Sequence, residues 1–417
     1  MNSEKAIQFL KRHGMEPERI HPSEAAVKMI EEMERGLAGQ ASSFPMIPTY
    51  LSDVGEIPLH EPVAVIDAGG TNFRRALVTF HEGGYDVEEL AKWKMPGIDA
   101  PATWEAFISF AADCMEPLME RTDRIGFCFS YSADITPEID GRVRSIDKEV
   151  VITGCEGRLV GQSLVDELAR RGYPGKRVAV LNDTVAVLLG GLAGKGAACP
   201  IGQVSGTGSN TCCSLPEKRI GKIGRRTDRR MIVNLESGMY DGLPRGDFDL
   251  ELDAESHNPG QKFFEKMTAG VYLGELVHRM LRCAAQEGEL SPATAEKIAA
   301  LGWIDSAVID AWAAGEKLAS VCSGGEDAAF VQTLSCSVFD RSARCMCANL
   351  IAIALLCAQK EARICAEGSL VQRSRAYRPA LEKYLAEVGA ELGVHALLAL
   401  GNETTLPGSA AAALLNI

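Results

Sequence analysis

Residues 62–80, PVAVIDAGGTNFRRALVTF, constrain the fold more than any other stretch of the chain. The pattern predicts a strand over residues 63–67, a tight turn at Gly69 and Gly70, and a second strand over residues 74–80. Glycine has no Cβ, so this turn can adopt positive φ and bring backbone N–H groups close to an anion. The stretch therefore predicts a β-hairpin whose turn is able to bind a negatively charged group.

Polar side chains lie on both sides of this turn. Asp67 ends the first strand, and Thr71 and Asn72 follow the glycines. One carboxylate beside a row of amide groups suits the phosphates of a nucleotide and their magnesium ion. A glycine pair alone also marks an ordinary turn, so the interpretation depends on two further stretches.

The two further stretches extend the pattern. Residues 202–215 again predict a strand, a glycine-threonine turn at residues 206–208, and a second strand. Residues 178–191 predict a strand that ends at Asn182 and Asp183 and is followed by a helix. An acid at such a junction is costly unless it is paired or used. Together the three stretches resemble the sugar kinase, heat-shock ATPase and actin superfamily, in which two related domains hold a nucleotide between paired hairpins.

Composition limits the class of protein. The chain has 417 residues, 46% of them hydrophobic, which is enough for about two or three domains. A net charge of −13 argues against a nucleic-acid partner. The thirteen cysteines show no zinc-binding spacing and follow no secretory signal, so we expect reduced thiols and a cytoplasmic protein. No apolar run is long enough to predict a membrane span.

Strands alternate with helices along the chain, which predicts an α/β protein with two lobes. We expect residues 1–60 to be an N-terminal helical segment on the large lobe, residues 61–185 with 402–417 to form the small lobe, and residues 186–401 the large lobe. Helices are predicted over residues 2–10, 23–37, 103–119, 163–171, 260–286, 328–366 and 410–414, and further strands over residues 124–129, 231–236 and 395–400.

A set of motifs in fixed order narrows the resemblance to eukaryotic-type hexokinases and glucokinases. The motifs are DAGGTNFR at 67–74, FCFS at 127–130, LNDTVA at 181–186, GTGSN at 206–210, VNLESG at 233–238, NPG at 258–260, FEKM at 264–267, YLGE at 272–275 and EGS at 367–369. The resemblance implies a two-lobed actin-like ATPase fold, also called ribonuclease H-like, with small and large α/β domains around a cleft.

The resemblance also implies an activity: ATP-dependent phosphorylation of a hexose, glucose or similar, at the 6-hydroxyl, giving hexose 6-phosphate and ADP. ATP and Mg²⁺ would be required, and a monomer or homodimer is expected, with no nucleic-acid or membrane partner. Two other functions stay open. The chain could be a sugar-responsive regulator on a kinase scaffold with weak turnover, or an actin-like or chaperone-type ATPase.

Site residues follow from the same resemblance. Asp183 would be the catalytic base, and Lys148 would reach the transferring phosphoryl group. The residues implied for sugar binding are Ser130, Asp147, Lys148, Asn182, Asp183, Asn210, Glu236 and Glu265. Those implied for the nucleotide are Asp67, Gly69, Gly70, Thr71, Asn72, Arg74, Thr207, Gly208, Gly270, Gly368, Ser369, Gly408 and Ser409. Magnesium would be held through the phosphates, near Asp67 and Asp183.

Simpler explanations exist for several of these side chains. Asp183 could cap the helix that follows it, and Glu265 could be an ordinary acid of a first helical turn. Glu236 could form a structural pair. Asp147 stands where the family carries a threonine; it could accept a sugar hydroxyl, pair with Lys148, or point into solvent.

Overall fold

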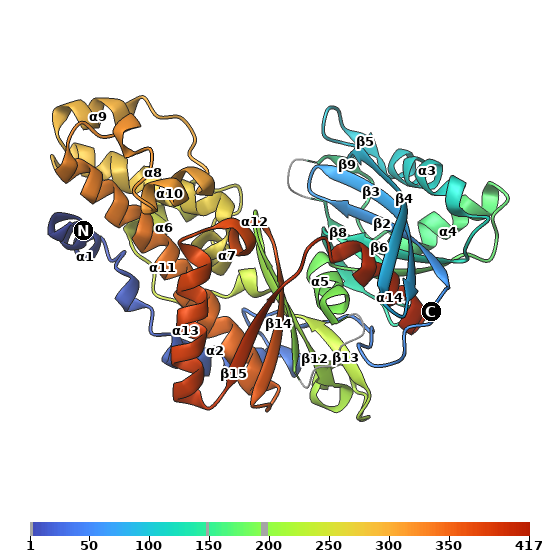
Figure 1. Ribbon diagram of the computed structural model, residues 1–417. Coiled ribbons are helices and arrows are strands. Elements are labelled where there is room, and N and C mark those ends of the chain that lie inside the picture. The colour runs from blue at the N-terminus through green and yellow to red at the C-terminus, as the bar shows by residue number, and fades with distance from the viewer. Residues whose placement is uncertain (1–2, 147–149, 193–198) are drawn as a thin grey trace.

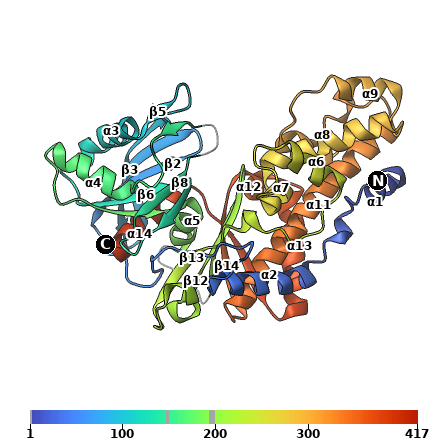
Figure 2. The same ribbon diagram turned by 180° about the vertical axis from the view of Figure 1, so that it is seen from behind.

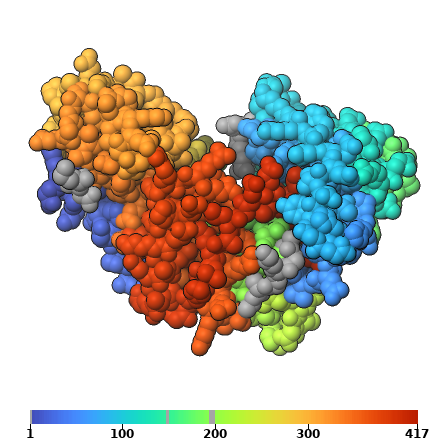
Figure 3. Space-filling model, viewed as in Figure 1, coloured from blue at the N-terminus to red at the C-terminus, as the bar shows by residue number. Residues whose placement is uncertain are grey.

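The computed structural model describes residues 3–146, 150–192 and 199–417, which form two lobes (Figure 1). Each lobe is built around its own β-sheet and carries helices on the sheet faces. In the space-filling view the molecule is hollowed between the lobes into an open cleft (Figure 3). The cleft is where we look for the predicted site residues.

The small lobe contains a five-stranded sheet in the order β10-β6-β2-β3-β4. Its strands are β2 (Pro62–Gly69), β3 (Asn72–His81), β4 (Gly84–Lys94), β6 (Arg124–Phe129) and β10 (Arg177–Leu181). β2 pairs antiparallel with β3 and parallel with β6, and β6 pairs parallel with β10. The carboxyl ends of β2, β6 and β10 therefore meet at one edge, the edge where α/β proteins bind ligands.

Helices cover both faces of the small sheet. They are α3 (Trp104–Met115), α4 (Val160–Arg170) and α14 (Thr405–Asn416), whereas α5 (Asp183–Leu192) packs on α14 and on the sheet of the large lobe. Successive residues of β2 point to opposite faces. Ala64 and Ile66 join the core formed with α3 and α4, whereas Val63 and Val65 join the core formed with α5 and α14. Thus α14 completes the small lobe although it follows the large lobe in sequence.

The large lobe contains a six-stranded sheet in the order β1-β13-β12-β11-β14-β15. Its strands are β1 (Ile47–Pro48), β11 (Pro200–Ser205), β12 (Ser209–Pro216), β13 (Arg230–Asn234), β14 (Glu361–Glu367) and β15 (His395–Leu400). β11 pairs antiparallel with β12 and parallel with β14. In the small sheet, β2 likewise pairs antiparallel with the next strand, β3, and parallel with a later strand, β6. The two predicted glycine hairpins therefore occupy equivalent places in the two sheets.

The helices of the large lobe pack against one long, buried helix, α11, or against the helices next to it. They are α1 (Glu4–Arg12), α2 (Pro22–Leu37), α6 (Asp247–Glu255), α7 (Phe263–Thr268), α8 (Gly270–Gln286), α9 (Pro292–Ala299), α10 (Ser306–Ala313), α11 (Gly325–Leu356), α12 (Ser369–Arg373) and α13 (Tyr377–Leu392). Both α1 and α2 contact α11, so the N-terminal helices lie on the large lobe (Figure 2).

The structure differs from the sequence-based prediction in several places, and the helices α6, α9, α10 and α12 lie outside every predicted range. The helix predicted over residues 260–286 is two helices, α7 and α8, because Ala269 between them has an extended backbone. The helix predicted over residues 328–366 ends at Leu356, and its last part is strand β14. Neither β4 nor α13 was predicted. The short strands β5 (Ala102–Thr103), β7 (Ser132–Ile135), β8 (Gly141–Ser145) and β9 (Ile152–Thr153) form two small paired ribbons.

Within the described ranges, no helix combines the length and the apolar character needed to cross a bilayer. All thirteen cysteines carry unpaired thiols, most of them buried.

Candidate active site

The first hairpin, between β2 and β3, carries a buried ion pair. Nε and Nη2 of Arg74 donate to Oδ2 of Asp67 at 2.9 and 2.5 Å. Burial raises the pKa of Asp67; Arg74 opposes this, and the charge of Asp183 adds to it. Arg74, predicted to bind the nucleotide, thus holds the Asp67 carboxylate in place.

The turn of this hairpin is open. Gly70 has φ of +56°, and a Cβ built there would meet nothing within 4 Å. Thr71 and Asn72 are exposed, and the Asn72 amide donates to the Thr71 hydroxyl at 3.2 Å. Exposed amides and hydroxyls at a positive-φ turn leave room for an anionic ligand.

Ser130 lies beside this turn because β6 runs parallel to β2. The Ser130 amide donates to the carbonyl of Ala68 at 3.1 Å. A Cβ on Gly69 would stand 3.1 Å from the Ser130 hydroxyl oxygen, so a larger residue would crowd it. The predicted sugar residue and the predicted phosphate turn are therefore neighbours.

Asn182 and Asp183 lie where β10 passes into α5. Oδ1 of Asp183 accepts the Thr184 amide at 2.7 Å, and the Asn182 side-chain oxygen accepts the same amide at 2.9 Å. The helix-capping role considered for Asp183 is therefore real. Within the described residues Oδ2 of Asp183 has no hydrogen-bond partner, so one carboxylate oxygen remains available for chemistry.

Asp183 lies where the two lobes meet, because α5, which begins at this residue, packs on the sheet of the large lobe. Its negative charge is among the causes that raise the pKa of Asp67 on the small sheet and the pKa of Glu236 on the large lobe, after burial in each case. A charge shifts the pKa of another group in this way only when the two groups lie close together. The carboxylate of Asp183 therefore faces a space bordered by both lobes.

Glu236 and Asn210 meet on the large lobe. The side-chain amide of Asn210 donates to the Asn234 oxygen at 2.9 Å and to Oε1 of Glu236 at 3.4 Å. The Asn234 amide donates to Oε1 of Glu236 at 2.7 Å. Glu236 has φ of +53°, which is uncommon for a residue with a side chain.

The sequence analysis missed Asn234, which holds Glu236 and Asn210 together. It lies within the motif at residues 233–238, at the end of a buried strand. A buried amide two residues from a carboxylate needs a partner. That pattern was the signal in the sequence.

Glu265 adds a third acceptor near the second hairpin. It lies on α7, and its Oε1 accepts the Ser209 amide at 3.4 Å. A Cβ on Gly208 would stand 3.0 Å from the same oxygen. Glu265 and Gly208 are thus close together, which the sequence alone did not show.

The predicted nucleotide residues of the large lobe form one cluster. The Gly270 amide, at the start of α8, donates to the Gly206 carbonyl at 2.8 Å. A Cβ on Gly206 would meet the Ser369 amide at 3.2 Å and Cα of Gly368 at 3.3 Å. Gly368 has φ of +124° and packs on the carbonyl of Ser205, where no side chain fits. The turn at residues 206–208, which includes Thr207, therefore packs against two other segments, the start of α8 and residues 368–369.

Gly408 and Ser409 require a correction. Ser409 is fully buried, and its hydroxyl donates to the Thr405 carbonyl at 2.8 Å within α14. A Cβ on Gly408 would stand 1.9 Å from the Ala186 carbonyl oxygen. Gly408 allows close packing of α14 on α5, so we remove both residues from the nucleotide-binding prediction.

Two predicted residues cannot be placed. Asp147 and Lys148 lie outside the residues that the structure describes. Their predicted contacts with sugar and phosphoryl group stay predictions.

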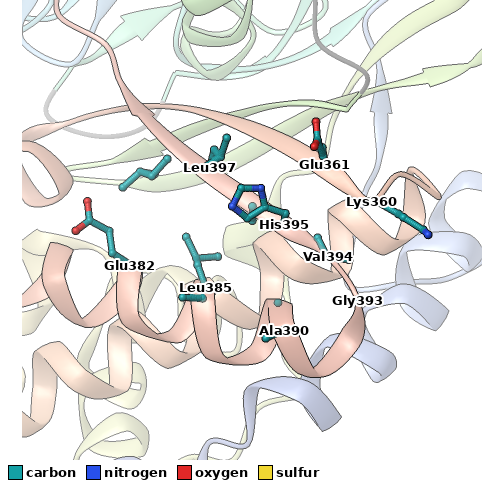
Figure 4. A pocket seen from close by; sticks show the side chains of 13 residues that line it. Lys360, Glu361, Glu382, Leu385, Ala390, Gly393, Val394, His395 and Leu397 are labelled. Carbon is teal, nitrogen blue, oxygen red and sulfur yellow. The ribbon is translucent and has the colours of Figure 1, made fainter.

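A surface groove elsewhere on the large lobe is separate from these residues. It lies between α13 and β15, has a volume of about 620 Å³ and is lined by Glu382, Leu385, His395 and Leu397 among others (Figure 4). None of the predicted site residues lines it.

Comparisons with known proteins agree with the motifs. Family models described as hexokinase match residues 7–192 and 200–415. Hexokinase-1 of Schizosaccharomyces pombe is 31% identical over 280 residues, which cover 63% of this chain and 57% of that protein. Hexokinase of Schwanniomyces occidentalis is 33% identical over 272 residues, covering 60% and 56%. The aligned region spans little more than half the length of these relatives.

Solved structures show the same fold. A hexokinase from Schistosoma mansoni complexed with glucose superposes with a TM-score of 0.81 at 21% identity, covering 98% of this chain and 99% of that one. The predicted two-lobed, actin-like kinase fold is confirmed. With both family models matched in order along the sequence, the chain belongs to the hexokinase family.

Proposed function

We propose that this protein transfers the terminal phosphoryl group of ATP to the 6-hydroxyl of a hexose, giving hexose 6-phosphate and ADP. The observation that carries the proposal is the position of Asp183, at the junction between β10 of the small lobe and α5, which packs on the sheet of the large lobe. Glucose is the hexose we propose, because the related Schistosoma mansoni hexokinase is described as complexed with it.

Sugar recognition rests on a group of acceptors with fixed positions. Asn234 orients Glu236 and Asn210, and Glu265 lies next to the second hairpin. A carboxylate accepts hydrogen bonds from neighbouring hydroxyls of one sugar. A pocket that binds each hydroxyl in this way rejects analogues that lack one.

Asp183 is the proposed general base. Capping through Oδ1 fixes the carboxylate, and Oδ2 would accept the proton of the 6-hydroxyl as that oxygen attacks phosphorus. Capping and catalysis are therefore compatible roles of one side chain.

Phosphate binding is proposed for the two glycine hairpins, with their amides donating to phosphate oxygens. The carboxylate oxygens of Asp67, which lies beside Gly69, and of Asp183 are hard donors that fit Mg²⁺ held mainly by phosphates. When bound, the ion supplies positive charge to the phosphate oxygens. Lys148 would add a further charge, on the strength of the family resemblance.

A coupled assay tests the proposal. Purified chain is mixed with ATP, Mg²⁺ and one of several hexoses, and ADP and hexose 6-phosphate are measured separately. We expect equal amounts of both products, formed only when hexose is present. Sugar binding without turnover would indicate a regulator instead, and ADP release independent of hexose would indicate an ATPase of the actin or chaperone type.

A further inference from the structure

Three side chains that could bind a metal ion meet far from the cleft. His13 follows α1, while Cys283 and Glu287 lie one turn apart at the end of α8. Residues at positions i and i+4 share one face of a helix. Because His13 is distant in sequence, spacing alone did not reveal this group.

The distances between the three donor atoms are those of a metal site. Nε2 of His13 is 3.1 Å from Oε1 of Glu287 and 4.0 Å from Sγ of Cys283, and Sγ is 3.6 Å from Oε1. Tetrahedral zinc, with bonds of about 2.0 Å to nitrogen or oxygen and about 2.3 Å to sulfur, separates such atoms by about 3.3–3.6 Å. Shifts of a few tenths of an ångström would close the triangle.

The imidazole of His13 is already oriented for this purpose. Oδ2 of Asp247 lies 2.9 Å from Nδ1, and the Asp247 amide donates to the His13 carbonyl at 2.9 Å. The ring also packs against Phe9 and Phe248. A carboxylate behind a histidine fixes the proton on Nδ1 and leaves the Nε2 lone pair for a metal.

His13 Nε2 and Glu287 Oε1 lie close enough to share one bound cation. With the proton on Nδ1, lone pairs of His13 Nε2 and Glu287 Oε1 face each other at 3.1 Å. Either a second ring proton or a cation must lie between them. The Cys283 thiol, which donates to Oε1 of Glu287 at 3.6 Å, adds a third possible ligand atom beside this pair.

Arg12 fixes the Glu287 carboxylate, and solvent reaches the three side chains. Arg12 donates to the other carboxylate oxygen of Glu287 at 2.9 Å and so holds Oε1 toward His13. The side chains of His13 and Glu287 are 14% and 36% exposed, which leaves an approach for solvent. Water would supply the fourth ligand.

We propose that His13 Nε2, Cys283 Sγ and Glu287 Oε1 bind one divalent ion of the zinc class and thereby fasten α1 to α8. One thiolate, one imidazole and one carboxylate are ligands that zinc accepts. Binding exchanges the thiol proton for the metal ion, so one proton leaves for solution. The site is independent of the proposed kinase activity and would stabilise the N-terminal segment on the large lobe.

The test uses the full chain without a histidine tag. Co²⁺ is titrated into metal-free protein, and visible bands of four-coordinate cobalt together with a near-ultraviolet thiolate-to-cobalt band are recorded. We expect one equivalent to produce both bands, Zn²⁺ to remove them, and Zn²⁺ to raise Tm. Cys283→Ser should abolish the thiolate band, and His13→Gln should weaken Co²⁺ binding at least tenfold, whereas Cys336→Ser, which removes an exposed thiol, should change neither.

Three results would overturn the proposal. They are the absence of both bands in the wild-type chain, the same bands in Cys283→Ser, and a Tm that Zn²⁺ does not change. Circular dichroism checks that each variant is folded. If Cys283→Ser or His13→Gln unfolds, Glu287→Gln decides: unchanged Co²⁺ affinity in that variant would leave a protonated ion pair as the explanation.

Discussion

Substitution can separate the proposed base role of Asp183 from its contact with the first turn of α5. Asp183→Asn keeps an oxygen that accepts the Thr184 amide but cannot take up a proton at neutral pH. We expect kcat to fall by roughly 10²–10⁴-fold in Asp183→Asn, the usual range for a positioned base. Hexose and ATP affinities, measured by calorimetry, should stay within a few-fold of wild type. Turnover near wild type in this variant would restrict Asp183 to helix capping.

We expect the ionised Glu236 carboxylate to lower the stability of the folded protein and to strengthen sugar binding. Its pKa is raised, first by burial, so the folded protein holds this proton more tightly than the unfolded chain does. The bound proton therefore contributes its full stabilisation of the folded state below the ordinary glutamate pKa. This stabilisation is lost as pH rises through the raised pKa of Glu236.

Replacing the ionised group should then help folding and harm binding. We expect Glu236→Gln to raise Tm by about 2 °C at pH 7 and to leave it unchanged near pH 4. Hexose KM should rise by about 10–100-fold, because a hydrogen bond to a charged acceptor is lost. Scanning calorimetry at the two pH values and the coupled assay measure both effects. A Tm that falls at pH 7 would contradict the interpretation of the raised pKa.

Sequence patterns predict the role of an individual residue well only where its neighbours in the sequence determine that role. The strand-end acids Asp67 and Asp183 follow from their junctions with glycine turns or a helix. Asn234 and Gly408 do not, because the partners that define them, Glu236 with Asn210 and the carbonyl of Ala186, come from other elements. A local sequence pattern cannot predict a role that a residue acquires only when distant segments pack together.

At the level of elements, the start of α8 supports the second hairpin. A Cβ on Gly270 would stand 2.8 Å from the Gly206 carbonyl oxygen, so Gly270→Ala must displace the hairpin. Overpacking of this kind costs about 1–3 kcal/mol, and we expect KM for ATP to rise about tenfold. Steady-state kinetics with varied ATP measures this.

A matched control exists at the start of α11. Gly325 is also the first residue of a helix, and a Cβ there would meet nothing within 4 Å. Gly325→Ala should leave KM for ATP unchanged and hexose KM likewise. An equal rise in both variants would show that the effect is not specific to the hairpin.

Helices and strands were predicted accurately where the local sequence pattern was strong. The hairpin β2–β3 and strand β6 match the predicted ranges closely, because apolar runs end at glycines or at polar residues. The run at 362–366 fits a strand as well as a helix, and only pairing with β11 and β15 makes it strand β14. The break between α7 and α8 likewise depends on a tertiary contact, the Gly270 amide bound to Gly206.

At the scale of the whole molecule, we expect hexose to close the cleft seen in Figure 3. Ser130 belongs to the small lobe, whereas Glu236 and Glu265 belong to the large lobe, so a sugar that touches all three favours the closed form. Glu236 also contributes, after Asp134, to the raised pKa of Arg144 on the small lobe, an attraction across the cleft. Closure would exclude water that competes with the sugar hydroxyl.

Small-angle scattering measures this motion. The radius of gyration should fall on saturation with hexose and change less with ATP alone. Glu236→Gln should need more hexose for the same decrease. An unchanged radius at saturating hexose would contradict closure driven by the sugar.

The position of α14 has a consequence for synthesis on the ribosome. The strands of the small sheet are made early, but the helix that covers Val63 and Val65 emerges only after the whole large lobe. Domains generally begin to fold in the order in which they leave the ribosome. Throughout that interval one apolar face of the first sheet stays uncovered, a surface that invites aggregation and that chaperones bind. If synthesis stopped anywhere within the large lobe, the released chain would therefore expose this apolar face in its N-terminal part and would be prone to aggregate.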